Sequence, residues 1–575
     1  MKKMLLVSVL FALACAGTLF AAGPYSEMIP LSSPVYRDMD DLYAVMGIGT
    51  PSNARPWSKG EAWHILARVD ADALRGVFRT LYDHLANEIR PGLRWQFSDG
   101  FGLGLGFESN IEMHAHSNGK DFGKDTDWVY RFEERRPFLK AWLDFGVKDF
   151  LYTYVDLRYG MGRTNPHDTV VHLESLPGWV GVGAIIPRNV GAGTTNYVTH
   201  SAVYSKGVSC NVPPTSAAFD FEWPKRAVFS LGGMFWNVSL ARDRIDWGNS
   251  HIGNFIVDDH VDFHDYFRFV AFTDHFKYDW LNLFFDTNPV GGEAMISEVR
   301  MLMAHRLEFR PWDWLTFAIS ENVMYRAPSA DFRFINPSFI FHNLNNRSMF
   351  NAIAHAELDI MLYQGLNLYG QFVLDQAKAP NESAAQADAW GILGGVEYAH
   401  VLGPGVLSSS LECAYTTPCL YRRDGVDFLM YRKYFTLGYS YILHFDYIGF
   451  PYGGDAQVLQ WEVSYRMPGY GAVTLSLMGM RHGEMNMFKS HNMGDDNDGY
   501  PNYVGRTPSG DVIDESLTVS LSGTYGIPRF SNWVGMSVWS RLDWVGRRKY
   551  TRSSRTYGAG SSDCQFTLGL RIALQ

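Results

Sequence analysis

Aspartate and histidine residues crowd one short stretch of the chain. Between positions 258 and 265 it contains Asp258, Asp259, His260, Asp262, His264 and Asp265. Such a cluster could bind a divalent metal or a sugar, or supply the Asp/His pair of a hydrolase. The alternative is a hydrated loop, which we expect because the spacing matches no known motif. We therefore predict no metal site and no cofactor, and keep three of these residues, Asp258, Asp259 and Asp262, as candidate sugar ligands.

Aromatic residues accompany this cluster in segments that are otherwise polar. Trp179, Tyr197, Tyr204 and Trp247 present flat apolar faces that can stack on sugar rings. Packing against the rest of the protein explains each of them equally well. We take Trp179, Tyr204 and Trp247 as candidate polysaccharide-binding residues, with both interpretations open.

Other motifs point away from an enzyme. The acidic run Gly494–Gly499 resembles a calcium loop, but glycine occupies positions 494 and 505, where an EF-hand requires acids. Three alternating glycines, Gly102, Gly104 and Gly106, lie in a strand-like stretch with no following helix, so they do not form a phosphate loop. Neither Gly-x-Ser-x-Gly nor His-Glu-x-x-His is present. The sequence predicts no catalytic residue.

The element pattern around the Asp/His cluster is that of paired strands. Four strand-like runs are Ala227–Leu231, Phe235–Asp246, Asp265–Asp274 and Tyr278–Asp286. Tight connections join the first pair and the second pair, and the longer polar segment Trp247–His264 separates them. Short and long connections that alternate in this way are typical of an outer-membrane β-barrel, with short periplasmic turns and long extracellular loops.

The same alternation of apolar and polar residues continues along the chain. The other predicted strands are Phe101–His114, Pro137–Gly146, Phe150–Gly160, Ile296–Phe309, Trp314–Tyr325, Asn351–Tyr363, Leu366–Asp375, Trp390–Ala399, Val406–Thr416, Gln457–Arg466, Gly471–Arg481, Ser516–Tyr525, Trp533–Trp544 and Gln565–Ala573. The fold class is thus an all-β transmembrane barrel of about 18 antiparallel strands. A soluble β-sandwich also alternates, but the strand lengths fit a bilayer better. The run Phe428–Ile448 is either an extracellular hairpin or two further strands.

Composition supports a barrel with aromatic girdles. Aromatic residues make up 15% of the 575 residues and charged residues only 19%, and mean hydropathy is −0.14. A soluble domain carries roughly 25% charged residues. The net charge of −10 argues against nucleic acid as a partner.

Three regions follow from these patterns. Residues 1–22 read as a signal peptide, with Lys2-Lys3 before an apolar run. Residues 23–92 carry helical patterns and predict a small periplasmic bundle with an α-helical fold. Residues 93–575 form the barrel with its long extracellular loops. Two cysteines, Cys413 and Cys419, are close enough in sequence to pair in an exported protein.

Several short stretches resemble the capsule-assembly (Wzi) family of outer-membrane proteins. They are Arg242–Asn254, the run Ala304-His-Arg306-Leu, Asn336-Pro337, Asn351, Leu374-Asp375-Gln376 and, near the N-terminus, Arg55-Pro-Trp-Ser58. The resemblance implies an 18-stranded barrel with a periplasmic helical bundle. It also implies a lectin-like role in attaching surface polysaccharide to the outer membrane.

Function is therefore expected at the cell outer membrane. The first hypothesis is a surface lectin that anchors exopolysaccharide, and the alternative is a porin or substrate-specific channel. An outer-membrane hydrolase is the third hypothesis, disfavoured by the missing motifs. The expected partners are surface polysaccharide, outer-membrane lipid and the barrel-assembly machinery.

Overall fold

The computed structural model describes most of the chain from Tyr25 to Leu574. Residues outside the description are 1–24, 91–94, 99, 124–126, 162–168, 173–183, 188–195, 201–207, 214–223, 287–298, 330–335, 339, 341–348, 378–387, 424–425, 436–440, 488–505, 532–533 and 575. The predicted signal peptide lies among them.

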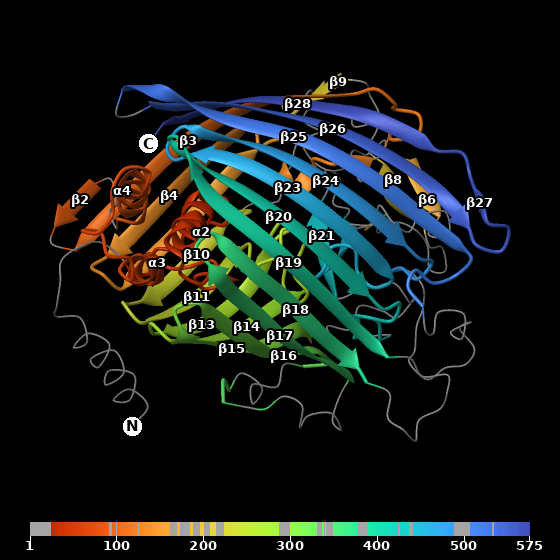
Figure 1. Ribbon diagram of the computed structural model, residues 1–575, viewed down its shortest axis with the longest axis horizontal. Coiled ribbons are helices and arrows are strands. Elements are labelled where there is room, and N and C mark those ends of the chain that lie inside the picture. The colour runs from red at the N-terminus through yellow and green to blue at the C-terminus, as the bar shows by residue number, and fades with distance from the viewer. Residues whose placement is uncertain are drawn as a thin grey trace.

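A closed antiparallel barrel of 18 strands dominates the described residues (Figure 1). Its strands are β3 (Phe101–His116), β4 (Leu139–Val147), β5 (Leu151–Tyr159), β10 (Ala227–Gly232), β11 (Trp236–Asp243), β13 (His264–Phe272), β14 (Phe276–Phe285), β15 (Val299–Trp312), β16 (Leu315–Ala327), β17 (Met349–Tyr363), β18 (Leu366–Gln376), β19 (Ala389–Leu402), β20 (Gly405–Thr416), β23 (Ala456–Met467), β24 (Gly471–His482), β25 (Val512–Ser531), β26 (Val534–Thr551) and β28 (Ser561–Leu574). Pairing of β28 with β3 closes the sheet. The predicted fold class is confirmed.

Alternating side chains give each barrel strand an inner and an outer face. On β11, for example, Leu240 is exposed on the outside, whereas Ser239 and Ala241 are buried. The outward apolar residues face lipid and the buried ones face the lumen. Because the period of a strand is two, this pattern also fixes the register of each pair.

Further strands do not belong to the 18 strands of the barrel wall. Short strands are β1 (Ala54–Arg55), β2 (Trp95–Ser98), β9 (Val208–Cys210), β12 (Asp246–Trp247) and β27 (Thr556–Tyr557). A separate five-stranded sheet contains β6 (Thr169–His172), β7 (Ala184–Pro187), β8 (Asn196–His200), β21 (Leu429–Phe435) and β22 (Tyr441–Tyr447). The run Phe428–Ile448 is thus a hairpin outside the barrel sheet, and not two more barrel strands.

Three α-helices precede the barrel: α2 (Val35–Met46), α3 (Lys59–Leu66) and α4 (Val77–Ile89). A 3-10 turn, η2 (Phe132–Glu134), lies in the connection between β3 and β4. Helix α2 ends at Gly47, which adopts a left-handed conformation with φ 74°. At the start of α3 the Ser58 hydroxyl accepts the Glu61 backbone N–H at 3.2 Å. The third helix begins only at Val77, because the residues before it up to Gly76 form turns.

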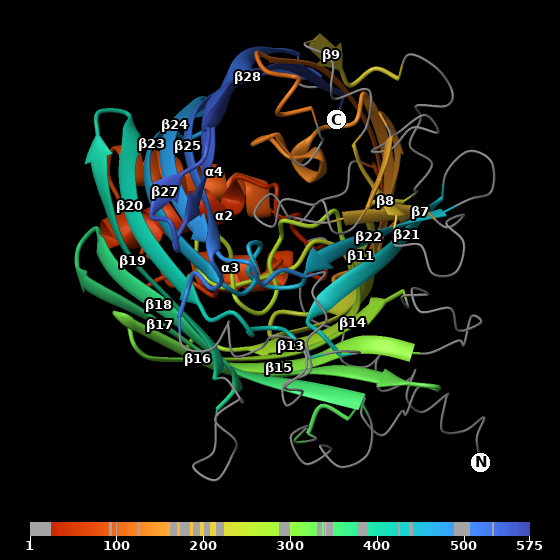
Figure 2. The same ribbon diagram turned by 90° about the vertical axis from the view of Figure 1, so that its right-hand side faces the viewer.

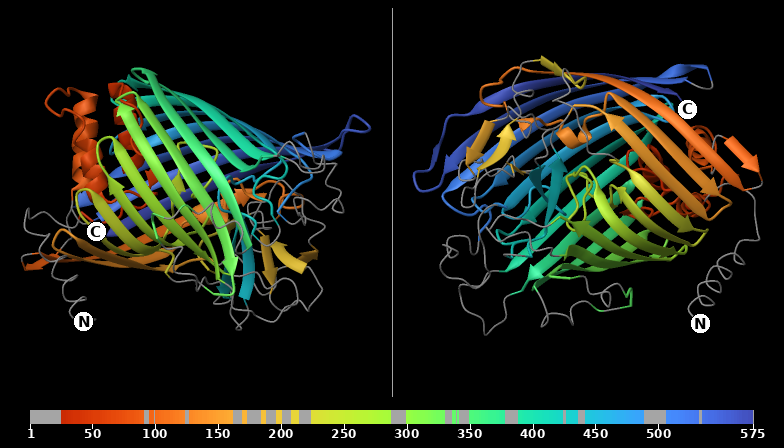
Figure 3. Two further views of the ribbon diagram at one scale, coloured as in Figure 1. Left: turned by 90° about the horizontal axis from the view of Figure 1, so that it is seen from below. Right: turned by 180° about the vertical axis from the view of Figure 1, so that it is seen from behind.

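The helices pack against the end of the barrel that carries the short turns (Figures 1 and 3). The Gly365 N–H donates to Ala44 O at 2.8 Å, and the Tyr25 N–H donates to Asp149 O at 2.9 Å. Short turns face the periplasm in this class of barrel, so the position fits the predicted periplasmic bundle. Among the described residues, none of the helices is both long and apolar enough to span a bilayer. Cys413 is exposed and Cys419 is buried, and no disulfide joins them.

Candidate functional site: the filled lumen

The segment Trp247–His264 folds into the barrel and is not the hydrated outer loop that the sequence predicts. Trp247 is fully buried, and β12 pairs with β1 of the N-terminal segment, so that Ala54 lies opposite Trp247. The Phe255 N–H donates to Gln371 Oε1 of the inner wall at 3.1 Å. The physical reason is apolar content, since Ile252, Phe255, Ile256, Val257 and Val261 join Trp247 in the buried cluster.

A second outer connection packs on this inward segment. The Tyr421 hydroxyl donates to Phe255 O at 2.6 Å, and the rings of Phe255 and Phe450 lie 5.5 Å apart. Leu420 and Ile448 are fully buried in the same apolar cluster. The lumen therefore contains a hydrophobic core of its own, built from two connections that are distant in sequence.

Charged wall residues hold the N-terminal segment inside the barrel from the other end. Arg268 of β13 donates to Pro56 O at 2.7 Å and pairs with Asp279. Asn53 donates its amide to carboxylates of β17, at 2.8 Å to Glu357 and at 2.9 Å to Asp359. The side chains of Arg268, Asp279, Asn53, Glu357 and Asp359 are all buried. Sequence reasoning missed these residues. For Arg268, Asp279, Glu357 and Asp359 the available signal was a charged residue within a predicted strand, whereas Asn53 lies outside the predicted strands.

Lysine 277 of β14 makes the most buried ionic contact between the wall and the helices. Its ammonium group pairs with Glu61 of α3 and also donates to Ser52 Oγ at 3.0 Å and to Ala54 O at 2.7 Å. The Lys277 and Glu61 side chains are only 2% and 4% exposed. Burial raises the pKa of Glu61, and the Lys277 charge opposes that shift.

Asp258 organises the turn of the inward segment. Its carboxylate accepts the Asn254 N–H at 2.7 Å, the His260 N–H at 3.2 Å, and lies 2.7 Å from His260 Nδ1. The residue is 5% exposed. Such a carboxylate stabilises the local backbone because buried donors need acceptors.

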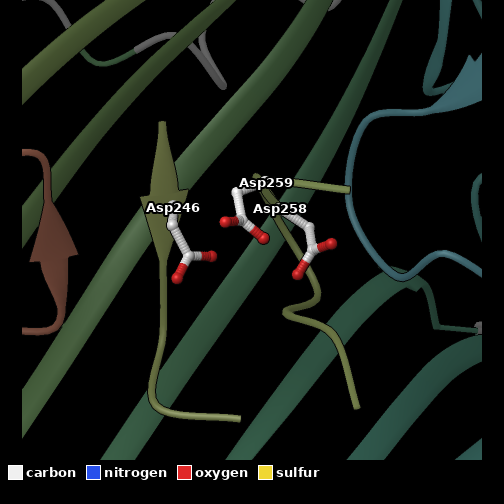
Figure 4. Close-up of side chains that lie close together, drawn as sticks. All are labelled: Asp246, Asp258 and Asp259. Atoms are coloured by element: carbon white, nitrogen blue, oxygen red, sulfur yellow. The ribbon is translucent and has the colours of Figure 1, made fainter. Parts of the chain in front are cut away.

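Asp246, Asp258 and Asp259 bring their carboxylates together. One oxygen from each lies within 4.8 Å of the others, and Figure 4 shows the three groups turned toward one another. Burial raises the pKa of Asp246 well above its usual range, with further contributions from Asp259 and Asp258. Burial and the neighbouring Asp258 also raise the pKa of Asp259. Three crowded carboxylates can share a proton or bind a hard cation such as Ca²⁺. The sequence predicts no metal site, and this geometry does not test that prediction.

The remaining predicted site residues lie elsewhere. Asp262 does not join this group, since it pairs with Lys225 at 3.4 Å. Trp247 lies in the apolar cluster and presents no face to the outside. Trp179 and Tyr204 fall outside the described residues.

A polar cavity of about 250 Å³ lies between the N-terminal segment, the inward segment and the wall. Its lining includes Tyr36, Arg55, Asp246, His251, Asp259 and Tyr369. Ligand sites for small molecules usually measure about 300–1,000 Å³. The cavity therefore suits water, an ion or one small polar ligand better than a polymer chain. Gly248, at φ 143°, lets Asn254 and Gln371 close over the cavity edge, where a Cβ would lie 2.0 Å from Asn254 Oδ1.

Comparison with known proteins supports the fold. No protein-family model and no curated protein matches the chain. Among solved structures it is similar to Wzi of Escherichia coli, described as a carbohydrate-binding β-barrel involved in group 1 capsule assembly, with 12% identity and a TM-score of 0.52 over 95% of this chain and 99% of that one. It is also similar to OprD of Pseudomonas aeruginosa, with 10% identity and a TM-score of 0.35 over 82% and 94% of the two chains. OmpT of Vibrio cholerae matches with 8% identity and a TM-score of 0.30 over 84% and 99%.

These likenesses concern the fold. The predicted location is confirmed: the chain is an outer-membrane β-barrel protein. The structure of Wzi is similar in fold to this chain, which agrees with the predicted resemblance to the capsule-assembly family. At 12% identity, membership of that family stays a prediction.

Proposed function

We propose that this protein binds surface polysaccharide at the outer membrane and holds it at the cell surface, without conducting solutes through its lumen. The observation that carries the proposal is the packed interior. The N-terminal segment and the inward segment Trp247–His264 meet inside the barrel at β1 and β12. A hydrophobic core holds the inward segment in place, and the buried Lys277–Glu61 pair and the hydrogen bond from Arg268 to Pro56 O hold the N-terminal segment to the wall. A general porin would need that space for its channel.

A polymer ligand then needs a surface outside the lumen. The sheet formed by β6, β7, β8, β21 and β22 joins two outer connections and lies beside the opening (Figure 2). Across β21 and β22 the buried Arg432 pairs with Asp446 at 3.0 Å, and Arg432 also donates to Phe263 O of the inward segment at 3.1 Å. This outer sheet is thus tied to the lumen core, and we assign it as the polysaccharide platform. The likeness to a barrel described as carbohydrate-binding supports the same assignment.

The test is binding of polysaccharide extracted from the surface of the source cells to the purified, folded protein on a biosensor. We expect saturable binding by the natural protein. Asp446→Ala leaves Arg432 buried without its carboxylate, and should weaken binding at least tenfold while the barrel stays folded. The matched control is Asp83→Ala, which removes a solvent-exposed partner of Arg79 on α4.

Single-channel recording in planar bilayers separates the two hypotheses. A binding protein with a packed lumen should give no regular conductance steps. Regular steps, together with no polysaccharide binding by folded protein, would replace this proposal with the channel hypothesis.

A further inference from the structure

A groove on the outside of the barrel opens where β20, β23, β24, β25 and β26 approach the long outer connections. It encloses about 880 Å³. Alternation along the strands places Leu459, Leu517 and Trp544 on the lipid-facing side, and all three are exposed. The groove is therefore separate from the lumen and from the outer sheet.

Glycines make the hollow. Gly479 of β24 and Gly546 of β26 flank Leu517 in the register of the sheet. A Cβ at Gly479 would meet nothing within 4 Å, so the space above it is open. A Cβ at Gly546 would lie 2.7 Å from Cη2 of Trp544, so the indole ring covers that glycine. The floor is thus apolar and the hollow is wide enough for an acyl chain.

Two arginines stand at the outer rim of the groove. Glu515 accepts from Nε of Arg481 at 3.1 Å and from Nε of Arg548 at 2.9 Å, and the two side chains are 45% and 51% exposed. Both bonds use Nε, which leaves the Nη groups available for a ligand. Arg548 also lies 3.9 Å from the ring centroid of Tyr557. One carboxylate therefore holds two guanidiniums in place, and the net charge of the trio is positive.

The height of this trio matches the edge of the membrane. From Glu515 to the exposed Tyr525 is ten residues along β25. At about 3.3 Å per residue and a strand tilt of about 40°, that run rises roughly 25 Å, which is the height of the apolar band of such barrels. The outward residues Leu517 and Leu521 lie between them. The arginines thus sit at the level of lipid headgroups in the outer leaflet.

We propose that this groove binds a phosphorylated glycolipid of the outer leaflet. The phosphate lies between Arg481 and Arg548, since guanidinium groups bind phosphate through paired hydrogen bonds. An acyl chain of the same lipid lies along Leu459, Leu517 and Trp544. The lipid anchors the outer end of β24–β26, away from the platform, and the site is independent of the polysaccharide function.

Native mass spectrometry of the purified full-length protein tests this. The probes are lipid A with its two phosphates, lipid A of the same acylation with the phosphates removed, and inorganic phosphate. We expect one phosphorylated lipid to be retained by the natural protein. The double variant Arg481→Gln/Arg548→Gln should retain it at least tenfold more weakly. Gly479→Leu, which fills the hollow and keeps both charges, should weaken it similarly.

The control variant Arg79→Gln/Lys120→Gln removes the same number of positive charges elsewhere and should retain the lipid normally. A heat-dependent gel shift checks that each variant is folded. Equal retention by the natural protein and by the folded arginine variant would overturn the proposal. So would equal retention of the dephosphorylated lipid, or displacement of the lipid by inorganic phosphate at equal concentration.

Discussion

The ion pair between Glu61 and Lys277 offers a strong test of how the helices are held to the barrel. We consider Glu61→Met, which removes the carboxylate and keeps the side-chain volume. The Lys277 ammonium then keeps only two neutral acceptors, Ser52 Oγ and Ala54 O, in a site where it is 2% exposed. Removal of one partner of a buried pair costs about 3–5 kcal/mol. Loss of a proton from the amine can relieve part of that cost.

This free energy converts directly into local opening. A factor of ten in population corresponds to about 1.4 kcal/mol. The population of molecules in which the segment around α3 is open should therefore increase by a factor of about one hundred to a few thousand. Hydrogen exchange of peptides covering residues 52–66, measured by mass spectrometry in detergent, reports that population. The neutral double variant Glu61→Met/Lys277→Met should recover most of the protection, because it leaves no unpaired charge.

The exposed pair between Arg79 and Asp83 on α4 is the matched control. Both side chains are about half exposed, so Asp83→Asn should change exchange by less than about fivefold. Unchanged exchange in folded Glu61→Met would refute the reasoning, since it would mean that the buried charge needs no partner. A double variant no better protected than Glu61→Met would refute it as well.

Three further predictions concern the inward segment and the thiols. Asp258→Ala removes the acceptor of two backbone N–H groups and should destabilise the segment by about 1–3 kcal/mol, seen as faster proteolysis after Trp247, whereas the solvent-exposed Asp83→Asn should leave proteolysis there unchanged. Asp259→Asn should raise the temperature of the gel-shift transition at pH 8 more than at pH 4. The reason is that the pKa of Asp259 is raised in the folded protein, so that ionisation of this carboxyl destabilises the fold as the pH rises above about 4. Added Ca²⁺ should reduce the difference between the gains at pH 8 and pH 4. An equal gain at both pH values would contradict this. Cys413 should react with maleimide in the folded protein and Cys419 only after unfolding, and a reductant-dependent change in gel mobility would show a disulfide and contradict this.

Strand-level features could be read from the sequence because they depend on local alternation. Leu517 and its neighbours alternate with serine and threonine, and each such run forms a barrel strand. The Ser58 cap and the Gly47 stop are likewise local signals. The sequence does not decide whether Phe428–Ile448 is a hairpin outside the barrel or two barrel strands, because a buried apolar run has the same pattern in both places.

The site could not be predicted for a physical reason. Pairing of Ala54 with Trp247 joins residues far apart in the chain, and a single sequence carries no signal for such a contact. The Asp/His residues predict a hydrated loop. The neighbouring Phe255 and Ile256 are apolar, however, and their packing buries this segment in the lumen. Similarly, Arg268 and Lys277 were visible as polar residues on strands, but their partners come from the N-terminal segment.

Polysaccharide binding by the purified protein is the measurement that tests the central claim most directly. The natural, folded barrel should bind the surface polysaccharide of its source cells with saturation, and Asp446→Ala should bind at least tenfold more weakly than Asp83→Ala. Absence of binding by folded natural protein, with regular conductance steps in the same preparation, would contradict the account.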